Sequence, residues 1–162
     1  MKLKIHLLLV ALLVWPVLAM AAPAAATKPE LLLVYWSSRD CTWCAAWEKP
    51  QPGMENGLKN SKEFKKITYR TIKSDRLVDP YVDEDYPSDL KWLKDRVDRG
   101  EESPAGRPGW AFYVNKTHIA SFYGVKAWDA TNFPAIKKLV AQYASDERLI
   151  TPSSAKSSGP RF

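Results

Sequence analysis

The sequence predicts an α/β domain in three layers, with a central mixed sheet of about four strands flanked by helices. Three observations support this prediction. Short apolar or β-branched runs alternate with segments of good helix formers. The first two strand-like runs are separated by a helical segment, as in a parallel crossover. The last two are separated only by a short polar turn, as in an antiparallel hairpin.

The ends of the 162-residue chain differ from its middle. Lys2 and Lys4 precede an apolar run at 5–18 and small residues at 19–22, which is typical of a secretory signal peptide cleaved after Ala21 or Ala22. We expect a signal peptide at 1–21, a tether at 22–28, one folded domain at 29–146, and a disordered tail at 147–162. The prediction is therefore a periplasmic or secreted protein, in a compartment where disulfides persist. An uncleaved membrane anchor is the alternative, although the apolar run is short for a span.

The first predicted strand, Leu31 to Trp36, leads into the only two cysteines, Cys41 and Cys44. On a helix that starts near residue 41, this spacing places both sulfurs on one face, within reach of a disulfide. The unpaired amides at the helix start would stabilise a Cys41 thiolate. A structural crosslink and half of a zinc site are the alternatives. However, a two-residue loop restrains the unfolded chain little, and His118 is the only histidine beyond the leader, so a redox pair is favoured.

The next elements follow from local patterns. We expect the cysteine helix to carry Trp47 into the core and to end at the prolines and glycine of 50–53. Ser61 can cap a short helical turn ahead of the second strand, Ile67 to Lys73.

The segment from Asp75 to Pro87 holds four aspartates and one glutamate, and we interpret it as a loop. Such a charge run is usually a solvated surface, and the functional alternative is that it lines the face of the cysteines and selects partners. From Ser88 as a helix N-cap, apolar residues recur every three or four positions and predict an amphipathic helix that ends at Gly100.

A hairpin and a helix complete the domain. Pro108 precedes an alternating strand, Asn115-Lys116 makes the turn, and Thr117 to Tyr123 forms the second strand. The last helix starts near Thr131. His118 falls on the exposed hairpin and is assigned no catalytic role.

The strand, turn, Cys-X-X-Cys and helix of residues 31–47 resemble the active-site region of the thioredoxin superfamily. Pro108 resembles the cis-proline of that family, with Pro104 as a competing candidate. The resemblance covers residues 29 to about 146 and implies a thioredoxin-like fold. It also implies that Cys41, accessible and opposite Pro108, attacks substrate disulfides and that Cys44 resolves the mixed disulfide.

The same resemblance implies a substrate-binding surface. The backbone of Arg107 would pair with an extended substrate, and Thr42 and Trp43 would contact it. The long cationic side chain of Arg107 would favour the Cys41 thiolate or acidic substrates.

Two short motifs, Lys28-Pro29 and Trp47-Glu48-Lys49, are similar to those of exported thioredoxin-like proteins. Two positions depart from thioredoxin itself. Asp40 replaces the tryptophan that usually precedes the first cysteine, and a carboxylate there opposes thiolate formation. Tyr35 replaces the buried acid that helps to move the proton of the resolving thiol.

Together these features predict an exported thiol–disulfide oxidoreductase acting on protein disulfides or dithiols, in a direction that the sequence does not define. We expect a monomer with no cofactor and no metal, and a redox partner such as a membrane reductant or oxidant carrier. The alternative is a redox-inert binding module with a closed disulfide that presents Trp43, Trp92 or Trp110. The net charge of +6 would also suit a nucleic-acid-binding protein. We disfavour this class because basic and acidic residues are interspersed and because we expect export.

Overall fold

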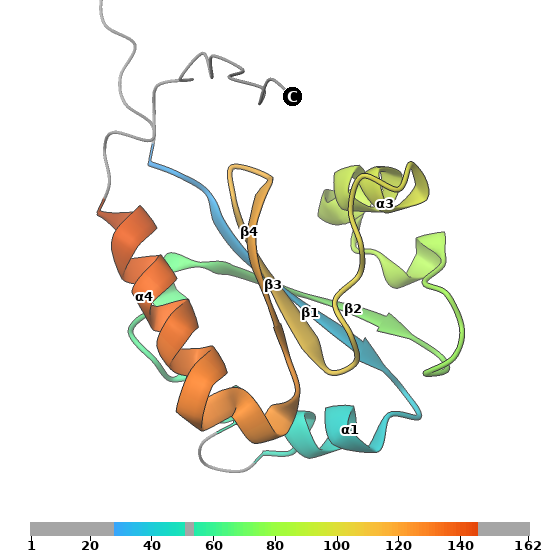
Figure 1. Cartoon of the computed structure of the whole chain (residues 1–162), viewed down its shortest axis with the longest axis horizontal. Helices are drawn as coiled ribbons and strands as arrows, with labels where there is room; N and C mark the ends of the chain where they lie inside the picture. The colour runs from blue at the N-terminus through green and yellow to red at the C-terminus, as the bar shows by residue number, and fades with distance from the viewer. Residues whose placement is uncertain (1–27, 51–53, 146–162) are drawn as a thin grey trace, which may run out of the picture.

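The computed structural model describes residues 28–50 and 54–145 (Figure 1). The predicted signal peptide, the tether up to residue 27, the helix-ending Pro52 and Gly53, and the predicted tail lie outside the described residues. The helices and strands, in chain order, are β1 (Leu31–Ser38), α1 (Thr42–Glu48), α2 (Glu55–Lys59), β2 (Thr68–Ser74), α3 (Lys91–Asp98), β3 (Gly109–Val114), β4 (Thr117–Tyr123) and α4 (Phe133–Ala144).

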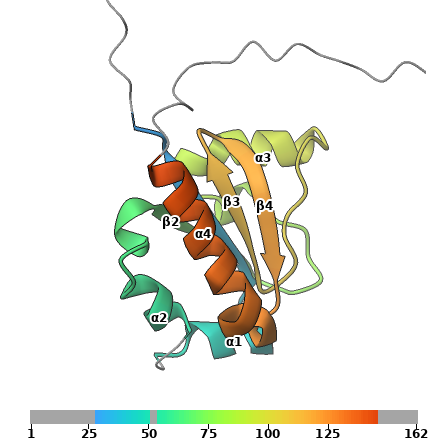
Figure 2. The same ribbon diagram turned by 60° about the vertical axis from the view of Figure 1, so that its left-hand side comes forward.

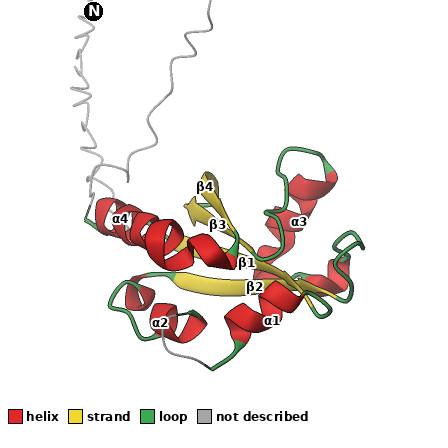
Figure 3. Ribbon diagram, turned by 60° about the horizontal axis from the view of Figure 1, so that its bottom comes forward, coloured by secondary structure: helices red, strands yellow, loops and turns green. Residues whose placement is uncertain are grey.

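The four strands form one mixed sheet in the order β2-β1-β3-β4, and Figure 3 shows them with the helices around them. β1 runs parallel to β2 and antiparallel to β3, and β3 and β4 form the predicted hairpin. The turn residues Asn115 and Lys116 both have positive φ angles, of 49° and 63°, the combination that a tight two-residue hairpin turn requires. The predicted class, an α/β fold with a four-stranded mixed sheet flanked by helices, is confirmed.

Helices cover both faces of the sheet (Figure 2). Alternate residues of a strand point to opposite faces, so β1 supplies both halves of the core. Its odd-numbered residues, such as Leu33, pack with side chains of α1, α2 and α4. Its even-numbered residues, such as Val34, pack with α3 and the residues leading into it. All eight residues of β1 are buried, as expected for a central strand.

Most element boundaries agree with the sequence prediction to within about two residues. α1 stops at Glu48, ahead of Pro50, and Ser61 accepts the Phe64 N–H at 3.2 Å as the expected cap. Gly100, with φ of 70°, follows the end of α3. Within the described ranges, no helix combines the length and apolar character that crossing a bilayer requires.

Two details of the prediction were wrong. Ser88 does not cap α3: residues Ser88–Leu90 form a 3₁₀ turn, and α3 begins at Lys91 with Leu90 at its N-cap. Leu90 is buried in the core, which fixes the start of the helix by packing instead of by a side-chain cap. The short helix α2 was not predicted. Leu58 is its only buried residue, so its sequence has no apolar periodicity that would indicate a helix.

Candidate active site

Cys41 and Cys44 form a disulfide at the start of α1, with their Cα atoms 5.1 Å apart. Cys41 is the N-cap residue of the helix, and its Sγ accepts the backbone N–H of Cys44 at 3.1 Å. Because a hydrogen bond to sulfur stabilises the charged form, the same N–H would favour a thiolate on Cys41 once the disulfide is reduced.

The two cysteines differ slightly in exposure. The exposed fraction of Cys41 is 3% and that of Cys44 is zero. The expectation of an accessible Cys41 is therefore corrected for the disulfide form: both cysteines are buried, and the Cys41 sulfur turns back onto the first turn of α1. The expected order, with attack by Cys41 and resolution by Cys44, stays a prediction.

The Arg107–Pro108 peptide bond is cis, as predicted, and among the described bonds the competing Pro104 has no such geometry. Pro108 lies at the end of the sheet beside α1. The next residue, Gly109, pairs with Trp36 of β1, and the Pro108 carbonyl accepts the Gly124 N–H at 3.0 Å. Sheet order, the cysteine pair at the helix start and a neighbouring cis-proline now coincide. The fold is thioredoxin-like.

The two residues between the cysteines are both exposed, and Trp43 is 52% exposed. Trp43 and Pro108 line one hollow of about 340 Å³ together with residues 123–127, which we call the Trp43 hollow. The Lys126 ammonium lies 5.2 Å from the centre of the Trp43 ring, in a cation–π contact. The structure thus brings two of the predicted substrate-contact residues, Trp43 and Pro108, to one surface.

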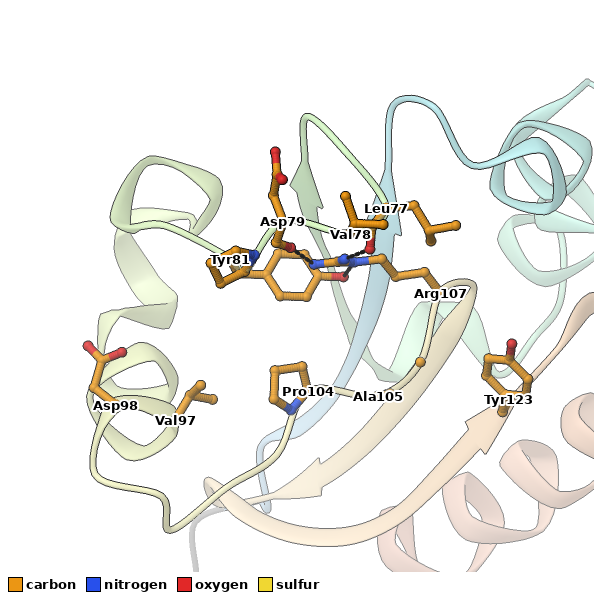
Figure 4. A pocket seen from close by; sticks show the side chains of 12 residues that line it. Leu77, Val78, Asp79, Tyr81, Val97, Asp98, Pro104, Ala105, Arg107 and Tyr123 are labelled. Carbon is orange, nitrogen blue, oxygen red and sulfur yellow. Dashed lines mark hydrogen bonds between the residues drawn. The ribbon is translucent and has the colours of Figure 1, made fainter.

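The side chain of Arg107 does not serve the role that the sequence suggested. Its guanidinium donates to the Tyr81 hydroxyl at 2.7 Å, to the Asp79 carbonyl at 2.8 Å and to the Leu77 carbonyl, and it lies 4.0 Å from the centre of the Tyr81 ring (Figure 4). These contacts direct the charge into the loop at 75–87 instead of toward Cys41 or an acidic substrate. The expected pairing of the Arg107 backbone with substrate stays a prediction.

The loop at 75–87 also binds the segment just before the disulfide. The Leu77 N–H donates to the Asp40 carboxylate at 2.6 Å, and Arg39 forms an ion pair with Asp75 at 2.7 Å. Leu77 is therefore hydrogen-bonded both to the neighbour of Cys41 and, through its carbonyl, to the neighbour of Pro108. The loop therefore lines the face next to the cysteines, whereas its selection of partners stays a prediction.

Tyr81 is a further residue that the sequence did not single out. Its hydroxyl accepts the Arg107 bond and donates to the Ser37 carbonyl at 3.2 Å, near the end of β1. The only signal for such a role in the sequence is an aromatic and apolar content, including Leu77 and Val78, that is unusual for a charged loop.

Aromatic side chains pack beneath α1. The ring centre of Trp47 lies 4.7 Å from that of Trp110 and 4.2 Å from that of Trp128, and Tyr35 stacks on Trp110 at 5.5 Å. Trp47 is fully buried, so its expected core position is confirmed. Trp110 is also fully buried and is not available to a partner, which removes it from the binding-module alternative.

Two titratable side chains lie against α1 or on it: Tyr35, which packs on Trp47, and Glu48. Burial raises the pKa of Tyr35 far above its usual value, so this residue stays neutral and does not replace the missing acid. Glu48, one helical turn after Cys44, accepts a hydrogen bond from Ser37 at 2.8 Å and pairs with Lys73 at 2.5 Å. This contact ties α1 to β1 and β2. In the sequence, the only feature that singles out Glu48 is its position four residues, about one helical turn, after Cys44.

No family model and no curated protein matches the sequence. Among solved structures, the chain is similar to the reduced form of the periplasmic thioredoxin SoxS from Paracoccus pantotrophus, with 15% identity and a TM-score of 0.44 over 70% of this chain and 98% of that one. It is also similar to the Malassezia sympodialis thioredoxin Mala s 13 (10% identity, TM-score 0.39, 74% and 80% covered) and to Fasciola hepatica thioredoxin (14%, 0.38, 72% and 83%).

Proposed function

We propose that this protein is an exported thiol–disulfide oxidoreductase that acts on protein disulfides or dithiols through Cys41-Thr42-Trp43-Cys44. The observation that carries the proposal is a disulfide at the start of a helix, with a cis-proline at the same end of the sheet. Cys41, whose sulfur accepts a backbone N–H at the start of α1, is the proposed attacking cysteine, and Cys44 is the proposed resolving one.

In the reducing direction, the Cys41 thiolate attacks one sulfur of a substrate disulfide. The substrate S–S bond breaks, a Cys41–substrate S–S bond forms, and the departing substrate thiolate takes up a proton. Cys44 then loses its proton and attacks the Cys41 sulfur, which releases the second substrate sulfur as a thiol. Two electrons and two protons pass from the Cys41–Cys44 dithiol to the substrate, and the disulfide seen here is the product.

Run backwards, the same steps oxidise a substrate dithiol, and no organic cofactor or metal is required. The direction depends on the reduction potential of the pair. Proteins that work by this chemistry range from about −270 mV for reductants to about −120 mV for oxidants. A membrane reductant or oxidant carrier would regenerate the pair, and the protein would act as a monomer outside the cytoplasm, in keeping with the predicted signal peptide.

Redox titration against dithiothreitol or glutathione tests the proposal. Trp43 lies between the cysteines and is half exposed, so its fluorescence should change with the state of the pair. Cys41→Ser should abolish reduction of insulin disulfides, and Cys44→Ser should trap mixed disulfides with substrates. A redox-inert binding module would instead give no titration and would keep its partner after Cys41→Ser.

A further inference from the structure

A second hollow, of about 730 Å³, is lined by Arg107 and lies next to the Trp43 hollow, with which it shares Tyr123. Figure 4 shows the residues that line it. We call it the loop hollow, because the loop at 75–87 forms one wall. The opposite wall is formed by residues 104–107 and by the end of α3 at Val97 and Asp98. The bonds of Arg107 to Leu77, Asp79 and Tyr81 hold the loop in place, so the hollow is a built feature of the fold.

The rim of the loop hollow exposes large apolar side chains. Val78 is 76% exposed, Tyr123 is 65% exposed and Leu77 is 45% exposed. Exposed apolar side chains are ordinary when they are scattered, but a group around a hollow is typical of an interaction site. Here the group borders a hollow next to the proposed exchange site.

Tyr123 lines both hollows, which places them side by side along the Arg107–Pro108 turn. A substrate strand paired with the backbone of Arg107 would cross this turn. Side chains on one face of a strand recur at every second residue. With the substrate cysteine at Cys41, the next side chain on the same face would therefore point toward the loop hollow.

The charge around the hollow indicates which residues would flank that side chain in the substrate. The loop at 75–87 contains five acidic residues and, as its only basic residue, Arg76. Two acidic residues line the hollow: Asp98 pairs with Lys94, whereas the Asp79 carboxylate has no ion-pair or hydrogen-bond partner within the described part of the chain. The positive charge of Arg107 is held against the loop carbonyls. A basic residue on the substrate is therefore complementary to this surface.

We propose that the loop hollow is a substrate subsite, which accepts a bulky apolar side chain two residues from the reactive cysteine in a segment that also carries lysine or arginine. This inference depends on the proposed function, because the substrate strand is placed by exchange at Cys41. The occupant is an extended segment of a client polypeptide.

The test follows the rate of mixed-disulfide formation by the reduced Cys44→Ser protein, in which the Cys41 thiolate attacks the peptide sulfur and releases the activating group. The probes are short peptides whose single cysteine is activated as a mixed disulfide with thionitrobenzoate. The position two residues before or after the cysteine is Phe or Gly, and the adjacent position is Lys or Glu. We expect one Phe-Lys peptide to react about tenfold faster than its Gly-Lys counterpart, and several-fold faster than Phe-Glu at low salt.

Val78→Ser should lower the rate for the favoured Phe-Lys peptide about threefold relative to its effect on the glycine peptide. Val82→Ser is the matched control, because Val82 is 51% exposed on the same loop but does not line the hollow. Equal rates for the Phe and Gly peptides, or equal effects of the two serine substitutions, would overturn the subsite. If no peptide reacts at all, the proposed function fails instead.

Discussion

Replacing Arg107 by lysine separates the loop-holding role of its guanidinium from its positive charge. The guanidinium makes three hydrogen bonds to the loop at 75–87, and a lysine ammonium in its place reaches one of these acceptors. Each of the two lost bonds contributes about 1 to 1.5 kcal/mol, at the low end for a charged donor because the side chain is only part-buried. The expected cost of Arg107→Lys is about 2 kcal/mol, concentrated in the loop.

Hydrogen exchange at the Leu77 amide measures this cost directly, because that N–H is bonded to Asp40 and is released when the loop opens. A loss of about 2 kcal/mol corresponds to roughly 30-fold less protection. Arg76→Lys is the matched control: Arg76 is exposed, and its side chain has no hydrogen-bond or ion-pair partner among residues 28–50 and 54–145. A change of less than about threefold in Arg107→Lys, or an equal change in Arg76→Lys, would refute the loop-holding role.

Three further substitutions test the core and the charges near α1. Trp47→Ala removes a fully buried indole and should lower the free energy of unfolding in urea by about 3–5 kcal/mol, whereas a loss below about 1 kcal/mol would contradict its core position. Glu48→Gln removes the ion pair with Lys73, whose two side chains are 29% and 30% exposed; we expect a loss of about 1 kcal/mol that shrinks in high salt, and a salt-independent loss would assign the effect to packing. Burial raises the pKa of Tyr86 to about 12, so ionisation favours the unfolded chain and stability should fall as the pH rises from about 10 to about 12. Tyr86→Phe should make the alkaline loss less steep, and an unchanged slope in pH-dependent unfolding would show that Tyr86 does not contribute.

The features that the sequence predicted share a local physical cause. The run from Leu31 to Trp36 is apolar on both faces because β1 lies in the middle of the sheet, and its pattern shows this directly. The spacing of Cys41 and Cys44 is a property of one helical turn, so it needed no knowledge of distant residues. The tight turn after β3 follows from its sequence in the same way.

The features that the sequence did not predict depend on contacts across the fold. Arg107 binds carbonyls that lie 28 and 30 residues earlier in the chain, and every residue carries a carbonyl, so no side-chain pattern announces these acceptors. From the sequence alone, the long cationic side chain of Arg107 next to Pro108 suggests a substrate contact. Only the position of the loop at 75–87 shows that the side chain is bound there instead. The start of α3 differs from the prediction for a similar reason, since burial of Leu90 determines it.

Leu77 gives the loop an influence on both halves of the proposed site. Its N–H binds Asp40, which precedes Cys41, and its carbonyl binds Arg107, which precedes Pro108. A shift of Leu77 therefore displaces the neighbours of the attacking sulfur and of the cis-proline together. Substitutions in the loop that move the backbone should change exchange chemistry and substrate binding at once, and turnover alone would not separate the two effects. The rate with a glycine peptide, which lacks the side chain that enters the loop hollow, reports the exchange chemistry alone. The ratio of the Phe-peptide rate to the Gly-peptide rate reports the binding of that side chain.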